Sequence, residues 1–429
     1  MKPISEVTAC VVDHGLFTHV AQCMAAQCKH VFFVGPPERV MRRLEDDIVG
    51  DGLDNITRIE SPYDVEDIAD VFVFPDVGFA ADQRKLIKDG RAVWGHHGGA
   101  VLETNKGYFL HVLEELGMEV PPHEVCVGMD ELSDYLHQKE DVYIKLSKWR
   151  EGWETAHWRN EELDGDWLRG HKFNRCPVRN HLRFYVFDKI DSDVEDGIDT
   201  WCINGEWPKL VLHGMERKDC GFLGGIQPMS AIDETIRSVN ETFGPFLETK
   251  FGYRGAFSTE VRPPFFIDPT CRFPSPPSQL QTVLIKNLPD VIYRGAHGIM
   301  VEPEYDDPLG AQVLITSDRD KAEYLTFPLD AELEPWVKMS FACEVDGVKR
   351  IAPNAMPNWA GWLTATGPTI QAVVETLKER KAMLPEGFEC DLNPMAKLLT
   401  ELEDAAEQGI EITDQEIPPQ EIVLEGDKA

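Results

Sequence analysis

The first hundred residues alternate short apolar segments typical of strands with amphipathic segments typical of helices. The predicted strands are rich in β-branched and aromatic residues and cover 6–12, 30–34, 56–60, 70–76 and 91–95. The predicted helices cover 17–27, 38–47 and 80–90. This alternation favours an α/β fold in which a mainly parallel, open sheet carries helices on its faces.

The loops after these strands are candidates for ligand binding, since open α/β sheets bind ligands at the carboxyl ends of their strands. They include Gly35-Pro36-Pro37, Asp76-Val77-Gly78 and His96-His97-Gly98-Gly99. The sequence leaves two interpretations of the histidines open: contact with a substrate, or a solvated position in the loop. A metal site is not expected there, because no acidic residue or cysteine lies nearby in the sequence.

The rest of the chain changes pattern. Residues 101–117 predict one amphipathic helix that ends at Gly117. Further elements are expected as a strand at 125–127, a helix near 129–138, a strand at 142–147, an antiparallel region at 180–290 with one helix near 231–249, and a helix at 368–380. Residues 401–429 predict a loose acidic tail.

The overall charge excludes some classes of function. The chain has 42 Lys and Arg against 75 Asp and Glu, a net charge of −33. Such a surface repels nucleic acid and anionic lipid, although a local basic pocket for a small anion is compatible with it. Neither a signal-peptide layout nor a long apolar span is present. Ten cysteines without C-x-x-C spacing indicate reduced thiols in a cytoplasmic protein.

Two groups of residues suggest phosphate chemistry. Lys145 ends an apolar strand and precedes a Gly-containing stretch, which suits a nucleotide phosphate; an ordinary surface lysine is the alternative. Glu260 and Asp268 flank Arg262-Pro263-Pro264, so a hairpin there would bring two carboxylates together, as a magnesium–nucleotide site requires. Solvated carboxylates at a sheet edge are the alternative. Arg272 would then neutralise a phosphoryl group in transfer.

Seven stretches in order along the chain resemble the ATP-grasp ligases, and within them the glycinamide ribonucleotide synthetase (phosphoribosylamine–glycine ligase) group. They are ETNKGYFLHVLEELGMEVP (103–121), VYIKLSKWREGWET (142–155), EDGIDTWCINGEW (195–207), MERKDCGFLGG (215–225), YRGAFSTEVR (253–262), FIDPTCRFPSPP (266–277) and ATGPTIQAVVE (365–375).

The resemblance implies which residues bind ATP. Lys106 and Lys145 resemble the two lysines that reach ATP phosphates, and Lys218 resembles a basic residue near them. The stretch 147–155, with Ser147 and Gly152, resembles the lid over the phosphates. Residues 186–191 resemble the hinge that reads adenine, through Asp188 and Ile190.

The resemblance also implies how ribose, metal and phosphoryl group are held. Asp199 resembles the acid that binds the ribose hydroxyls. Glu260 and Asp268 resemble the magnesium carboxylates, and Arg272 resembles the family's catalytic arginine, with Lys145 and Lys218 as further catalytic residues. Domains are expected at 1–105, 106–289 (an ATP-grasp unit divided near 186–191) and 290–400 (a small α+β domain), before the tail 401–429.

The chain departs from the family at three places. Thr270 stands where the family has asparagine, SKWREGWET replaces the usual lid, and CGFLGG replaces the substrate loop Asn-Thr-Gly-Gly-Met-Gly. The resemblance therefore implies an ATP- and Mg²⁺-dependent ligase that joins a small-molecule carboxylate to an amine through an acyl phosphate, with a substrate different from phosphoribosylamine. A homodimer is compatible with it. A non-catalytic nucleotide-binding homologue is the alternative.

Overall fold

The computed structural model describes residues 1–35, 48–147, 155–174, 178–190, 195–218, 220–317, 324–352 and 358–407. The chain forms two compact units. The first contains Met1–Gly98, Asp196–Ser258 and the chain from Thr270 onward, and the second contains Gly99–Glu195 and Thr259–Pro269. The domain limits expected from the sequence stay a prediction.

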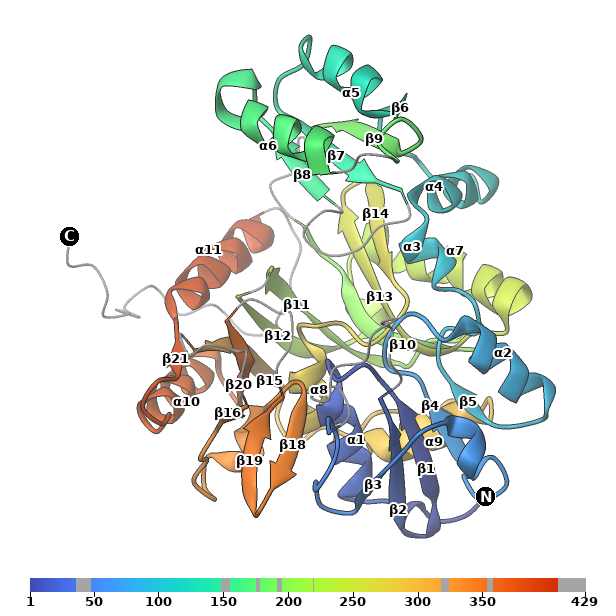
Figure 1. Cartoon of the computed structure of the whole chain (residues 1–429), viewed down its shortest axis with the longest axis vertical. Coiled ribbons are helices and arrows are strands. Elements are labelled where there is room, and N and C mark those ends of the chain that lie inside the picture. Colours follow the sequence, from blue (N-terminus) through green and yellow to red (C-terminus); the bar gives the residue numbers. More distant parts are fainter. Residues whose placement is uncertain are drawn as a thin grey trace. The chain divides into compact units, whose positions relative to one another are not determined.

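A five-stranded parallel sheet lies in the first unit, in the order β3–β2–β1–β4–β5 (Figure 1). Its strands are β1 (Thr8–Val12), β2 (His30–Val34), β3 (Ile56–Ile59), β4 (Val71–Val73) and β5 (Val93–Trp94). Every neighbouring pair is parallel, which confirms the predicted α/β class. The strand order reverses between β1 and β4, so the carboxyl ends of these two strands flank the position where such sheets bind ligands.

Helices cover both faces of this sheet. The last four residues of β1, Ala9–Val12, are all buried, which explains its continuous apolar sequence. On the two faces lie α1 (Thr18–Ala25), which packs on β2 and β3, α9 (Leu288–Ala296), which packs on β4 and β5, and α2 (Ala80–Lys88), which packs on β5. The helix predicted at 38–47 lies outside the described residues.

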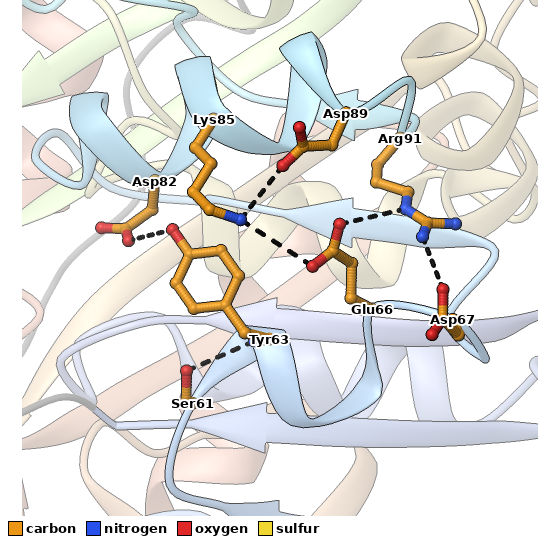
Figure 2. Close-up of polar contacts among 8 residues, drawn as sticks. All are labelled: Ser61, Tyr63, Glu66, Asp67, Asp82, Lys85, Asp89 and Arg91. Atoms are coloured by element: carbon orange, nitrogen blue, oxygen red, sulfur yellow. Dashed lines mark hydrogen bonds and ion pairs between the residues drawn. The ribbon is translucent and has the colours of Figure 1, made fainter.

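A polar network fixes α2 to the short helix η3 (Pro62–Val65) (Figure 2). The Tyr63 hydroxyl donates to Asp82 at 2.6 Å, and the Lys85 ammonium lies 4.2 Å from the centre of the Tyr63 ring. Lys85 also contacts Glu66 at 3.9 Å, and Arg91 donates to Glu66 at 3.4 Å. Because α2 follows β4 directly, this network holds the far end of the loop that follows β4.

The second unit contains an antiparallel sheet in the order β6–β9–β7–β8. Its elements are β6 (His123–Val127), β7 (Val142–Leu146), β8 (Thr155–Trp158), β9 (Arg183–Asp188), α5 (Met129–Leu136) and α6 (Glu161–Asn174). Met129, Leu132 and Ile144 lie in its core. Trp158 is also in this core and donates its indole N–H to the Lys139 carbonyl at 3.1 Å, so it is a structural residue of the unit.

The prediction of a single helix at 101–117 is wrong in one respect. The structure has two helices, α3 (Val101–Thr104) and α4 (Lys106–Glu115), with a break at Asn105, whose φ and ψ are −138° and 87°. The Asn105 side chain accepts a hydrogen bond from the Tyr108 N–H at 3.3 Å. An asparagine that caps a new helix in this way competes with continuation of the preceding one.

A large antiparallel sheet has the order β14–β13–β10–β11–β12–β15–β20–β17, and β21 pairs with β15. Its strands are β10 (Ile198–Ile203), β11 (Leu210–Arg217), β12 (Gly221–Pro228), β13 (Arg254–Arg262), β14 (Phe265–Thr270), β15 (Leu309–Thr316), β17 (Val337–Lys338), β20 (Trp359–Gly367) and β21 (Glu389–Cys390). A small sheet contains β16 (Leu325–Thr326), β18 (Ala342–Val345) and β19 (Val348–Ile351). The predicted antiparallel region and its hairpin at 262–265 are confirmed.

Among the described residues, the sequence did not predict helices α6, α8 (Ser278–Leu284), α9 and α11 (Asn393–Glu407). The helices of this part are α7 (Glu234–Phe251), α8, α10 (Ile370–Ala382) and α11, besides the short helices η1 (Ile4–Glu6), η4 (Met229–Ala231) and η5 (Glu334–Trp336). α8 buries glutamines as well as leucines, so it lacks an amphipathic pattern. α11 continues past residue 401, where the loose tail was expected to begin. Among the described residues, no helix has the length and apolar character needed to cross a bilayer.

Candidate functional site

Lys106, Lys145 and Asp268 meet in the second unit. The two lysine ammonium groups each contact one oxygen of the Asp268 carboxylate, and Lys106 also donates to the Ile267 carbonyl at 3.0 Å. The side chains are only 5%, 15% and 20% exposed, respectively. Two cations thus share one carboxylate at low exposure, which gives these three groups a net charge of +1 and suits them to an anion.

Asn105 positions both lysines. Lys106 is the first residue of α4, directly after the Asn105 cap. The Asn105 side-chain oxygen also accepts a hydrogen bond from the Ser147 hydroxyl at 3.3 Å, two residues beyond Lys145. The start of α4 is thereby held at the end of β7. Sequence reasoning missed Asn105, although an asparagine before a helix-forming run is a capping signal.

Gly107 allows α4 to approach β9. A Cβ at this position would lie 2.0 Å from the Tyr185 hydroxyl oxygen. Tyr185 is the residue opposite Lys145 in the pairing of β7 with β9. The start of α4, where unpaired backbone N–H groups favour an anion, therefore lies against the same part of the sheet as Lys145.

Glu260 and Asp268 are the two carboxylates that were expected from the sequence to hold magnesium. Glu260 is half-buried on β13, and Asp268 lies on the neighbouring strand β14. Within the described part of the chain, no cluster of three or more acidic, histidine or cysteine side chains could hold a metal ion. Mg²⁺ commonly takes one or two carboxylates and completes its shell with phosphates and water. Glu260 and Asp268 have the donor type that magnesium prefers, and in this structure both Asp268 oxygens contact the two lysines.

The other residues expected at the site are spread over both units. In the second unit, Asp188 is exposed at the end of β9, 3.4 Å from the Lys139 ammonium, and Ile190 is half-buried. In the first unit, Asp199 is half-buried on β10 and Lys218 is exposed after β11. Gly152 and residues 148–154 of the expected lid, with Trp149 and Trp153, lie outside the described residues.

Arg272 belongs to the first unit and lies beside Asp76. Its Nε is 3.9 Å from Asp76 Oδ1, and its Nη1 donates to the Phe273 carbonyl at 3.0 Å. The Phe273 N–H donates to the Pro75 carbonyl at 2.9 Å, which fixes this segment to the loop after β4. The structure thus joins Arg272 to a loop at the carboxyl edge of the parallel sheet.

His96 and His97 close the loop after β5. The fully buried His96 donates from Nε2 to the Gly78 carbonyl at 2.7 Å and accepts at Nδ1 from the Gly98 N–H at 2.9 Å. His97 Nε2 lies 2.9 Å from the Val93 carbonyl, and burial lowers the pKa of its ring. Both ring nitrogens of His96 are occupied and its side chain is buried, so the solvated position considered for it is wrong, whereas His97 is half-buried.

Comparisons with known proteins were made at three levels. No family model matches the chain, and no curated protein matches its sequence. Solved structures do match. Phosphoribosylamine–glycine ligase from Thermotoga maritima superposes with a TM-score of 0.68 at 15% identity, over 90% of this chain and 99% of that one. The chain has the fold of an ATP-grasp ligase.

Two other structures support the same fold. The biotin carboxylase domain of 2-oxoglutarate carboxylase from Hydrogenobacter thermophilus, solved with MgADP, ADP and bicarbonate, gives a TM-score of 0.61 at 12% identity over 96% of this chain and 97% of that one. L-amino acid ligase from Bacillus licheniformis gives 0.57 at 13% identity over 89% and 98%. The resemblance identified from the seven sequence stretches is confirmed as a shared ATP-grasp fold.

Proposed function

We propose that the chain is an ATP- and Mg²⁺-dependent ligase that joins a carboxylate to an amine and releases ADP and phosphate. The observation that carries this proposal is the buried cluster in which Lys106 and Lys145 share Asp268. A cluster of this charge suits a polyphosphate with its magnesium ion. The ligase fold and the MgADP bound to a structural neighbour support the same assignment.

In this proposal each charged residue has a separate role in binding ATP or stabilising the transferred phosphoryl group. Lys106 and Lys145 bind phosphate oxygens and offset the charge that moves when the γ-phosphoryl group is transferred. Glu260 and Asp268 would hold Mg²⁺, which supplies further neutralisation of the phosphates. The same proposal assigns adenine to Asp188 and Ile190, ribose to Asp199, and the phosphoryl group to Arg272 and Lys218. The proposal also assigns the role of a lid over the phosphates to the stretch 147–155, with Ser147 and Gly152.

The reaction has two steps. A carboxylate oxygen of the substrate attacks the γ-phosphorus, and ADP leaves with the electrons of the broken P–O bond. The nitrogen of the amine, as the free base, then attacks the carbonyl carbon of the acyl phosphate. Phosphate leaves with the electrons of the broken C–O bond and takes up the proton that the nitrogen releases as the amide forms. No protein nucleophile is required, and exclusion of water protects the acyl phosphate. The replaced substrate loop favours a substrate other than phosphoribosylamine.

Nucleotide turnover tests the proposal. The full-length protein is given ATP, Mg²⁺ and pools of carboxylates, with hydroxylamine to trap an acyl phosphate as a hydroxamate. Lys145→Ala should lower carboxylate-dependent ADP release by about a hundredfold or more, as loss of one electrostatic contact to a transition state does. The matched control is Lys172→Ala, which removes an exposed lysine of the same unit.

Two outcomes would contradict the proposal. Release of AMP and pyrophosphate would show a different mechanism. Nucleotide binding without carboxylate-dependent turnover would favour the non-catalytic homologue, for which Thr270 in place of the family's asparagine is the supporting feature.

A further inference from the structure

Asp13 and Asp76 occupy the ligand-binding edge of the parallel sheet. Asp13 is the first residue after β1, and Asp76 lies three residues after β4. The order β3–β2–β1–β4–β5 reverses between these two strands. Open α/β sheets bind their ligands at the carboxyl ends of their strands, at such a reversal of strand order.

One oxygen of Asp13 receives no hydrogen bond from the described part of the chain. Its side chain is fully buried, and its Oδ2 accepts hydrogen bonds from the backbone N–H groups of Gly15 at 2.8 Å and Phe17 at 2.9 Å. Its Oδ1 is buried and has no hydrogen-bond partner among the residues that the structure describes. A buried carboxylate oxygen that lacks a donor is costly, and a ligand that supplies an N–H group removes this cost.

The charge of Asp76 affects the ionisation of Asp13. Burial and then the charge of Asp76 raise the pKa of Asp13 to about 7. Side chains of the same two loops also contact each other, because the His14 and Phe79 rings stack with their centres 4.5 Å apart. The loops after β1 and β4 therefore lie side by side, with a fully buried carboxylate on one and a largely buried carboxylate on the other.

Arg272 lies at this edge of the sheet and also has a role in the proposed reaction. Its guanidinium is 3.9 Å from Asp76, and the hydrogen bond from Phe273 to Pro75 fixes it there. In the proposed function Arg272 stabilises the phosphoryl group on the substrate carboxylate. The amine must reach the carbon next to that group, so its binding groups are expected beside the arginine.

We propose that Asp13 and Asp76 bind the ammonium group of the amine substrate, and that one of the two carboxylates accepts its proton before the nitrogen attacks. This inference rests on the proposed function and names the substrate class of its second step. Two buried carboxylates attract a cation that donates N–H groups and repel a phosphate. The amine substrate is therefore an unphosphorylated primary amine, such as an amino acid, an amino alcohol or a small alkylamine.

The first test separates the two steps of the reaction. Hydroxylamine is uncharged at about pH 8 and traps the acyl phosphate without an ammonium group to be bound. Asp13→Asn and Asp76→Asn should each raise the KM for an ammonium-bearing acceptor by about tenfold or more, measured against hydroxamate formation by the same variant. Asp54→Asn, an exposed aspartate of the same unit, is the matched control and should change neither rate.

The second test measures binding without turnover. Thermal unfolding of the wild type is followed with ethanolamine, with methylammonium and with phosphoethanolamine at equal ionic strength. The two cations should raise the unfolding temperature, phosphoethanolamine should not, and Asp13→Asn should abolish the response.

The outcomes separate the inference from the proposed function. Absence of hydroxamate in the wild type refutes the proposed function, and the binding test then decides the inference alone. Unchanged KM in both variants, an equal thermal response in wild type and Asp13→Asn, no response of the wild type to either cation, or a preference for phosphoethanolamine would each overturn the inference.

Discussion

Replacement of Asp13 by asparagine should change how the stability of the protein depends on pH. Burial, and then the charge of Asp76, raise the pKa of Asp13 from 3.8 to about 7. The folded state therefore binds the proton of this carboxyl more tightly than the unfolded state does. Its contribution to the free energy of unfolding is fully present below pH 3.8 and is lost as the pH rises through about 7.

The size of the effect follows from the two pKa values. Between about pH 5 and about pH 8 the wild type should lose about 3 kcal/mol from this group, because roughly two pH units below the folded pKa are crossed at about 1.4 kcal/mol each. Asparagine does not titrate in this range. Its amide oxygen can still accept the N–H groups of Gly15 and Phe17.

Chemical denaturation followed by tryptophan fluorescence provides the assay. The unfolding free energy of Asp13→Asn minus that of the wild type should rise by about 3 kcal/mol from about pH 5 to about pH 8, since all other titrating groups cancel in this difference. Asp54→Asn, whose carboxylate is exposed, should show no such rise. A change of less than about 1 kcal/mol for Asp13→Asn would refute the reasoning that burial, and then the charge of Asp76, raise the pKa of Asp13.

Two further predictions concern the start of α4. Gly107→Ala places a methyl group 2.0 Å from the Tyr185 hydroxyl and should destabilise the protein by about 1–3 kcal/mol, measured by denaturation; Tyr185→Phe in the same chain should recover part of the loss, and no recovery would contradict the proposed clash. Asn105→Ala removes a helix cap and should cost about 1 kcal/mol and weaken ATP binding, whereas Asn105→Asp should keep most of the stability; equal losses in both variants would show that the cap is unimportant.

Local patterns were sufficient for the parallel sheet of the first unit. The strand 30–34 has the bounds expected from its apolar run, and the other four strands of the sheet lie within their expected ranges. These segments are short, apolar and separated by helices, so their periodicity alone indicates a parallel sheet. The break at Asn105 was missed because apolar spacing continues across it, and the side-chain cap that divides the two helices is a single polar contact.

The candidate site was predictable only where residue type and position together indicate chemistry. Lys145 ends a strand and Asp268 follows a Pro-Pro hairpin, and both features are visible in the sequence. Asp13 was missed because it reads there as the end of an apolar run. Its position opposite Asp76 depends on the order of β1 and β4 in the sheet, which chain order does not specify.

The acidity of the chain and an anion site in it are compatible because electrostatic effects differ in range. A net charge of −33 is spread over 429 residues, and salt screens exposed charges beyond about 8 Å at physiological ionic strength. Lys106 and Lys145 act at contact distance and are largely removed from water, so their attraction for a phosphate is screened much less. A long polyanion would cover the acidic surface as well as the lysines, whereas a nucleotide needs only the lysines. The charge that argues against nucleic acid therefore leaves ATP as a ligand that this cluster can hold.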